Sequence, residues 1–134
     1  MTDFVVDASI VAAWLLPDED NELAEQARTA MVDSDALAPD LLWHEIRNIL
    51  VIAERRNRVA TDGIANLLTK LRRVPLRIIG VNDDLRIVQL ARDHRLSGYD
   101  ATYLALATAE NLPLITLDKK LNEAARAVGL PAFG

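Results

Sequence analysis

Short apolar runs of the kind found in buried strands alternate along this chain with longer stretches whose apolar residues recur at helical spacing, and this alternation constrains the fold most. The first run, Phe4-Val5-Val6, ends at Asp7, and an apolar helix over residues 10–16 stops at Pro17. Further strands are predicted at residues 36–38, 76–79, 114–116 and, as a final edge strand, 131–133. Further helices are predicted at residues 20–33, 40–57, 61–73, 82–95, 101–110 and 119–128. Strands separated by helices predict an α/β fold with a parallel sheet covered on both faces.

Length and composition limit the chain further. With 134 residues, of which 51% are hydrophobic, residues 1–134 are expected to form a single domain, because domains commonly contain about 100 to 150 residues. The sequence has no cysteine, which excludes disulfides and thiolate zinc clusters. No apolar stretch reaches the ~18 residues of a membrane span, and the start MTDFVV lacks the basic segment of a secretion signal. We therefore expect a cytoplasmic protein that does not bind membranes.

Charge is distributed unevenly along the chain. The formal net charge is −5, but acidic residues dominate the first third and arginine dominates the middle. The acidic third fits either concentrated carboxylate chemistry or a solvated face. Six arginines of the middle are candidates for contacting the phosphates of a nucleic acid, with ordinary helix surface as the alternative. They are Arg55, Arg56, Arg58, Arg72, Arg73 and Arg77.

Acidic side chains occupy positions where parallel sheets commonly bind ligands. Asp7 directly follows the first strand, and Asp118 lies two residues beyond the strand that ends near Thr116. Asp100 begins the helix after a Ser-Gly-Tyr turn, and Glu45 lies in the first turns of the helix predicted from residue 40. Ligands bind at the carboxyl ends of the strands in such sheets, so we expect these four carboxylates to converge there.

Four carboxylates at one edge of a sheet repel one another unless a cation lies between them. Oxygen ligands suit the hard ions Mg²⁺ and Mn²⁺, which can orient a phosphodiester, lower the pKa of an attacking water and stabilise the leaving oxygen. Taken singly, each acid is a weak indicator, since Asp118 and Asp40 can be simple helix caps and Glu45 a solvated side chain. Asp7 is the strongest candidate, because it directly ends a buried strand. Together the acids predict metal-assisted phosphoryl chemistry.

Four segments together resemble one known family. They are FVVDASIVAAWLLPDE at the start, HEIRNIL with Glu45 and Asn48, GYDATYLALA with Asp100, and LPLITLDKKL with Thr116 and Asp118. In this order and spacing, they resemble the PIN-domain ribonucleases, and within these the VapC toxins of bacterial toxin–antitoxin pairs, over nearly the whole chain.

The resemblance implies a fold, an activity and a set of site residues. The fold is expected to be a PIN-like α/β/α sandwich with a central parallel sheet of about four to five strands flanked by helices. The implied activity is Mg²⁺-dependent endoribonuclease cleavage, in which Mn²⁺ substitutes. The implied catalytic and metal-binding residues are Asp7, Glu45, Asp100 and Asp118. Ser9 and Thr116 resemble family hydroxyl positions that hydrogen-bond the acids or bound water, and Asn48 is a third supporting residue.

The resemblance also implies partners. One is a small antitoxin protein that blocks the site, often by inserting a basic side chain among the carboxylates. The other is a second copy of the chain, in a homodimer that places two active sites along one groove. Trp14 and Trp43 lie in apolar segments, 11–16 and 41–46, and these segments are expected to form an exposed groove that receives the antitoxin. The alternative is that both tryptophans belong to the core.

Other chemistries lack their motifs. His44 and His94 lie far apart, with neither cysteine nor HExxH spacing, which argues against a zinc site. No GxSxG, P-loop or GxGxxG sequence occurs, and an aromatic content of 4% supplies few platforms for stacking bases. Two function classes therefore remain: a metal-dependent ribonuclease, and a partner-binding PIN-like module with weak or no nuclease activity.

Overall fold

The computed structural model describes residues 2–134, and its four strands form one parallel sheet in the order β3-β2-β1-β4. The strands are β1 (Phe4–Val6), β2 (Ala36–Pro39), β3 (Arg77–Ile79) and β4 (Leu114–Ile115). β1 lies inside the sheet, where Val5 is in register with Leu37 of β2 and with Leu114 of β4. The expected parallel α/β sheet is therefore confirmed, with four strands.

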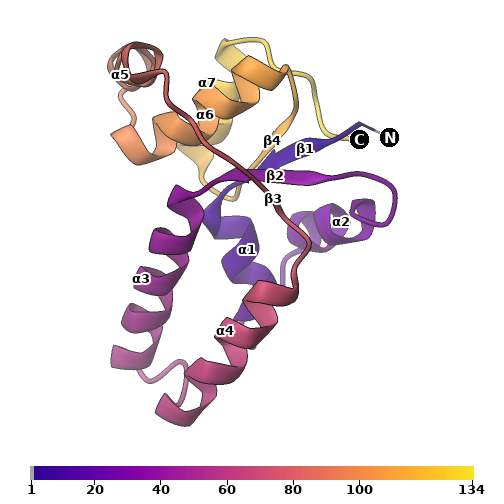
Figure 1. Cartoon of the computed structure of the whole chain (residues 1–134), viewed down its shortest axis with the longest axis vertical. Helices are drawn as coiled ribbons and strands as arrows, with labels where there is room; N and C mark the ends of the chain where they lie inside the picture. Colours follow the sequence, from indigo (N-terminus) through magenta and orange to yellow (C-terminus); the bar gives the residue numbers. More distant parts are fainter. Residues whose placement is uncertain (1) are drawn as a thin grey trace.

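Helices connect the strands and cover both faces of the sheet (Figure 1). They are α1 (Ala8–Leu15), α2 (Glu22–Ala30), α3 (Leu41–Arg55), α4 (Ile64–Arg73), α5 (Asp84–His94), α6 (Gly98–Glu110) and α7 (Lys119–Ala127), with a 3₁₀ turn η1 (Thr61–Gly63) before α4. Helices α1 to α4 pack on one face and α5 to α7 on the other. Side chains of a strand alternate between faces, so Phe4 and Val6 join the first layer and Val5 the second. This is the expected α/β/α sandwich.

Short polar side chains begin most of the helices. Asp7, Asn21, Asp83, Ser97 and Asp118 each accept a backbone N–H from the first turn of the helix that follows. The predicted cap before α3 is different. Asp40 precedes that helix, but its backbone is already helical and its side chain makes no capping hydrogen bond. None of the helices described over residues 2–134 has both the length and the apolar character needed to cross a membrane.

The predicted edge strand over residues 131–133 is wrong. These residues belong to no strand or helix. Pro131 has no backbone N–H to donate to a neighbouring strand. The ring of Phe133 instead packs edge-on against Phe4, with ring centroids 5.4 Å apart. Aromatic packing over β1 therefore replaces strand pairing at this end of the chain.

The exposed apolar groove expected around the two tryptophans is also wrong. Trp14 is 5% exposed, and its Nε1 donates a hydrogen bond to the carbonyl oxygen of Ala24 at 2.7 Å, so α2 covers it. Trp43 is half-buried on α3, with the guanidinium carbon of Arg72 4.0 Å from the centre of its ring. The segment 11–16 is buried because α2, α3 and α4 all pack against α1. Trp14 is therefore a core residue, as the alternative interpretation predicts.

Candidate active site

Asp7 ends β1 and caps α1, which places its carboxylate at the carboxyl edge of the sheet. Oδ1 accepts the backbone N–H groups of Ser9 and Ile10 at 3.1 and 3.3 Å and the Ser9 hydroxyl at 2.6 Å. Oδ2 accepts the hydroxyl of Thr116. Asp7 is only 5% exposed, and burial raises its pKa to about 6. The hydrogen bonds from Ser9 and Thr116 oppose this rise in pKa, and the negative charge of Asp100 adds to it.

The loop after β4 is joined to the start of α1 through two hydroxyl groups. Thr116 Oγ1, which donates to the capping carboxylate of α1, accepts the backbone N–H of Asp118 at 3.0 Å. Ser9 Oγ donates to the same carboxylate and accepts the backbone N–H of Leu117 at 2.9 Å. Asp118 itself caps α7, since its Oδ1 accepts the N–H of Leu121 at 2.9 Å. Both hydroxyls thus hold the β1–α1 junction and the β4–α7 loop together.

Asp100 is the carboxylate that interacts with all the others. It lies in the first turn of α6, where its backbone N–H donates to Oγ of Ser97 at 3.0 Å. Partial burial raises the pKa of Asp100, and the charge of Asp118 adds to the rise. The charge of Asp100 in turn raises the pKa of Asp7 and of Glu45. Asp100 is therefore electrostatically coupled to each of the other three acids.

Glu45 and Tyr103 face each other across α3 and α6 without hydrogen-bond geometry. In the described residues, neither Oε1 of Glu45 nor the hydroxyl of Tyr103 has a hydrogen-bond partner, although both atoms are buried. Burial raises the pKa of Glu45, the nearby Tyr103 hydroxyl opposes the rise, and Asp100 adds to it. Burial, followed by Glu45, also raises the pKa of Tyr103. A buried polar atom without a partner is costly, and a bound cation satisfies such a carboxylate oxygen.

The four carboxylates suit a hard cation chemically, but they do not form a closed cage. Oε1 of Glu45 has no hydrogen-bond partner in the described chain, and burial raises the pKa values of Asp7, Glu45 and Asp100, which is compatible with a bound Mg²⁺. Over residues 2–134, however, no three His, Asp or Glu side chains are gathered closely enough to hold a metal ion.

A cavity of about 470 Å³ opens beside Glu45. The residues that line it are Leu41, His44, Glu45, Asn48, Ile49 and Tyr99. Asn48, expected to support the site, therefore lies in the cavity wall one helical turn after Glu45. The lining contains one of the four candidate carboxylates.

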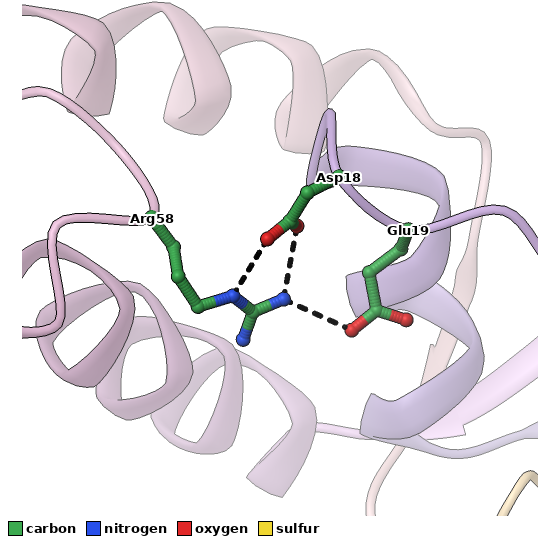
Figure 2. Close-up of polar contacts among 3 residues, drawn as sticks. All are labelled: Asp18, Glu19 and Arg58. Carbon is green, nitrogen blue, oxygen red and sulfur yellow. Dashed lines mark hydrogen bonds and ion pairs between the residues drawn. The ribbon is translucent and has the colours of Figure 1, made fainter.

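Three of the six arginines expected to contact phosphate are engaged within the chain. Arg58 donates from Nε and Nη2 to the two carboxylate oxygens of Asp18 at 2.8 and 2.9 Å, and from Nη2 to Glu19 at 3.3 Å (Figure 2). Nη1 of Arg77 lies 3.4 Å from a carboxylate oxygen of Asp35, and the guanidinium of Arg72 stacks on the ring of Trp43. The guanidinium of Arg58 already binds two carboxylates, so its contact with phosphate stays a prediction. No ion pair in the described part of the chain involves Arg55, Arg56 or Arg73.

Two aromatic residues of this region are absent from the sequence-based set. Tyr103 follows Asp100 by three residues, so both lie on the same side of α6. Tyr99 immediately precedes Asp100 and lines the cavity. Spacing around Asp100 is the signal that could have identified both residues.

Comparison with known proteins shows the family. Residues 4–127 match the PIN domain family. The chain is 34% identical over 131 residues to Ribonuclease VapC3 of Pyrobaculum aerophilum, a match that covers 95% of this chain and 98% of the relative. The crystal structure of PAE2754 from Pyrobaculum aerophilum has the same fold, with a TM-score of 0.70 and 23% identity over 92% of this chain and 87% of that one. A toxin–antitoxin complex from Klebsiella pneumoniae matches with a TM-score of 0.62 and 23% identity over 88% of each chain. The chain therefore belongs to the PIN-domain family and is related to the VapC ribonucleases.

Proposed function

We propose that this chain is a Mg²⁺-dependent endoribonuclease that acts as the toxin of a type II toxin–antitoxin pair. The observation that carries the proposal is the buried, unpartnered Oε1 of Glu45 in a region where carboxylates raise one another's pKa values. The relationship to Ribonuclease VapC3 supports the activity. The protein is proposed to act as a single PIN domain over residues 1–134, in the cytoplasm, where its RNA substrate is.

In the proposed chemistry, the four carboxylates hold the metal ion. Mg²⁺ held by them would lower the pKa of an attacking water and stabilise the charge on the leaving oxygen of the phosphodiester, and Mn²⁺ is expected to substitute. Asp7 serves as the rigid ligand, because hydrogen bonds fix both of its oxygens. Glu45, Asp100 and Asp118 supply the remaining oxygens from α3, α6 and the cap of α7. The N-termini of α1, α6 and α7 also lie here, and their partial positive charge favours an anionic phosphate.

The proposed partners are a small antitoxin and a second copy of the chain. The solved toxin–antitoxin complex from Klebsiella pneumoniae supports an antitoxin, since its fold matches this one. The site offers a reason for inhibition. A basic side chain inserted beside Glu45 and Asp100 supplies the counter-charge that these carboxylates lack and thereby competes with Mg²⁺.

The nuclease proposal is tested by cleavage of a fluorogenic RNA in Mg²⁺ and in EDTA. We expect cleavage by the wild-type chain in Mg²⁺ alone, and no cleavage by Asp7→Asn. Asp93→Asn is the matched control, because Asp93 is an exposed carboxylate on α5 outside the site. Cleavage that persists in EDTA, or that Asp7→Asn retains, contradicts the proposal and favours the partner-binding module.

The antitoxin proposal needs a separate test. The chain is co-expressed with the product of the adjacent small gene and examined by size exclusion chromatography and by the same RNA assay. We expect a complex that elutes together and cleaves little RNA. A chain that neither co-purifies with that product nor loses activity in its presence excludes the proposed antitoxin.

A further inference from the structure

Tyr99 is the aromatic side chain that this protein exposes most. It is 64% exposed, and it is the one aromatic residue among the exposed large hydrophobic side chains of the described chain. The other aromatic residues, all buried or half-buried, are Phe4, Trp14, Trp43, Tyr103 and Phe133. Aromatic surface of this kind is the platform on which proteins stack nucleic-acid bases. Although the chain is poor in aromatic residues, it places one beside Asp100 of the candidate site.

The cavity that Tyr99 lines is large enough to hold a nucleobase. Its volume of about 470 Å³ lies in the range of roughly 300 to 1,000 Å³ that is typical of small-molecule sites. Leu41 and Ile49 contribute apolar wall, whereas His44 and Asn48 contribute polar groups. Apolar walls with a few placed polar groups are what a flat, hydrogen-bonding ligand requires.

The hydrogen-bonding state of His44 can be assigned from its neighbour. Nη2 of Arg47 lies 2.9 Å from Nδ1 of His44. A guanidinium has donors and no acceptor, so Nδ1 must accept, and the neutral ring carries its proton on Nε2. His44 therefore offers an N–H donor, and the amide of Asn48, one turn further along α3, offers both a donor and an acceptor. These groups complement the edge of a base that is not already paired.

The position of the cavity connects it to the carboxylates. Glu45 belongs to the cavity wall, and the charge of Asp100 acts on Glu45. Tyr99 and Asp100 are consecutive residues in the first turn of α6. A base held in the cavity therefore brings the phosphodiester attached to its own nucleotide to the region where Glu45 and Asp100 lie.

From these observations, we propose that the cavity is a nucleobase subsite, in which an unpaired base next to the scissile phosphate stacks on Tyr99 and is hydrogen-bonded by His44 and Asn48. The inference rests on the proposed ribonuclease function and deepens it, since it names the residues that contact the base beside the scissile phosphate. A duplex is disfavoured because its bases are stacked on one another and their pairing edges are occupied.

The test separates binding from cleavage. Binding of a short, fluorescein-labelled single-stranded RNA is measured by fluorescence anisotropy in EDTA, and KM and kcat are then measured in Mg²⁺. We expect Tyr99→Ala to weaken binding roughly 5- to 100-fold, the effect that follows removal of one stacking aromatic, and to raise KM more than it lowers kcat. Tyr99→Phe keeps the aromatic ring, so it should bind within about twofold of wild type. Duplex RNA of the same sequence should show no such difference between variants.

Leu85→Ala is the matched control, because Leu85 is a large exposed side chain, 67% exposed, on α5 and outside the cavity lining. Equal single-strand affinity of wild type and Tyr99→Ala overturns the subsite, while metal-dependent cleavage by wild type still supports the nuclease. A wild-type chain that neither binds nor cuts any RNA overturns both proposals. If Tyr99→Ala changes only the oligomeric state on size exclusion, the face contacts protein and the subsite is likewise overturned.

Discussion

Two groups of carboxylates in this protein are in opposite electrostatic situations. On the loop between α1 and α2, Asp18 and Glu19 share the guanidinium of Arg58 (Figure 2), and hydrogen bonds from Arg58 lower the pKa of Asp18. At the carboxyl edge of the sheet, burial and neighbouring carboxylates raise the pKa values of Glu45 and Asp100. The carboxylates of Asp18 and Glu19 are thus paired with a positive charge, whereas those of Glu45 and Asp100 have no ion-pair partner within residues 2–134.

The contrast identifies what is unusual about the second group. In the described chain, none of the four candidate site acids forms an ion pair, and the charge of Lys120 only moderates the pKa of Asp100. The Arg58 cluster is solvent-exposed, where such pairs are screened and contribute little. Half-buried carboxylates without an ion-pair partner, such as Glu45 and Asp100, are what the proposed Mg²⁺ would neutralise.

The largest expected effect is on catalysis, and it separates the two groups of carboxylates. Asp100→Asn should lower kcat for RNA cleavage roughly 100- to 1,000-fold, the decrease that follows removal of one electrostatic element of a site. Asp18→Asn should leave kcat unchanged, because Asp18 serves the Arg58 cluster alone. The measurement is the steady-state rate of cleavage at saturating RNA. Similar decreases in the two variants would mean that the two carboxylate groups do not differ in function.

The second prediction concerns the pH dependence of stability without metal. Burial raises the folded-state pKa of Asp7 from its ordinary value of 3.8 to about 6, so the folded protein binds a proton more tightly than the unfolded chain. Ionised Asp7 therefore lowers the free energy of unfolding. This decrease is absent below about pH 4 and complete above about pH 6. The free energy of unfolding of wild type relative to Asp7→Asn should fall by up to about 3 kcal/mol over that window, measured by urea unfolding in EDTA. A difference independent of pH contradicts the raised pKa.

The third prediction is that Mg²⁺ or Mn²⁺ stabilises the wild-type fold. An ion that binds only the folded state at ten times its Kd adds about 1.4 kcal/mol to the free energy of unfolding. Differential scanning calorimetry should show this rise in wild type and its absence in Asp100→Asn, whereas Asp18→Asn should retain it. No shift in wild type at millimolar metal contradicts the site.

The smallest expected effect concerns the ion pairs of Arg58 with Asp18 and Glu19. Arg58→Ala should lower the melting temperature slightly, and the difference should shrink as salt is added, because exposed ion pairs are screened. It should leave the salt dependence of RNA binding unchanged, since Arg58 is occupied by Asp18 and Glu19. A second variant with Arg55, Arg56 and Arg73 all changed to Ala should flatten that salt dependence by about one unit of slope for each arginine that binds a phosphate. A flattened slope in Arg58→Ala would reassign this residue to RNA binding.

Local features of the fold and site are predictable from sequence, and distant pairings are not. Asp7 and Asp118 are identified because each follows a strand and begins a helix, which short segments reveal. The pairing of Arg58 with Asp18 joins residues 40 positions apart, and no local pattern marks it. The strand predicted at residues 131–133 failed because packing of Phe133 on Phe4, which joins the two ends of the chain, outweighed local propensity.

The same limit applies within the site. The sequence marks Glu45 and Asp100 as candidates, but the unpartnered state of Glu45 Oε1 depends on where the fold places its neighbours. Tyr103 has the sequence context of an ordinary core aromatic, and its buried hydroxyl becomes informative only when its surroundings are known. Burial also sets the pKa of Asp7, and burial is a property of the assembled sheet.

The hydrogen bond between Thr116 and Asp7 spans 109 residues, and β1 reaches one of its two neighbours only when β4 is present. On the ribosome, Asp7 and Glu45 are made well before Thr116 and Asp118. A nascent chain therefore carries an incomplete acid set, with Asp7 missing one of its hydroxyl partners. For the proposed ribonuclease, this order of assembly delays activity until the segment that contains Thr116 and Asp118 has been made.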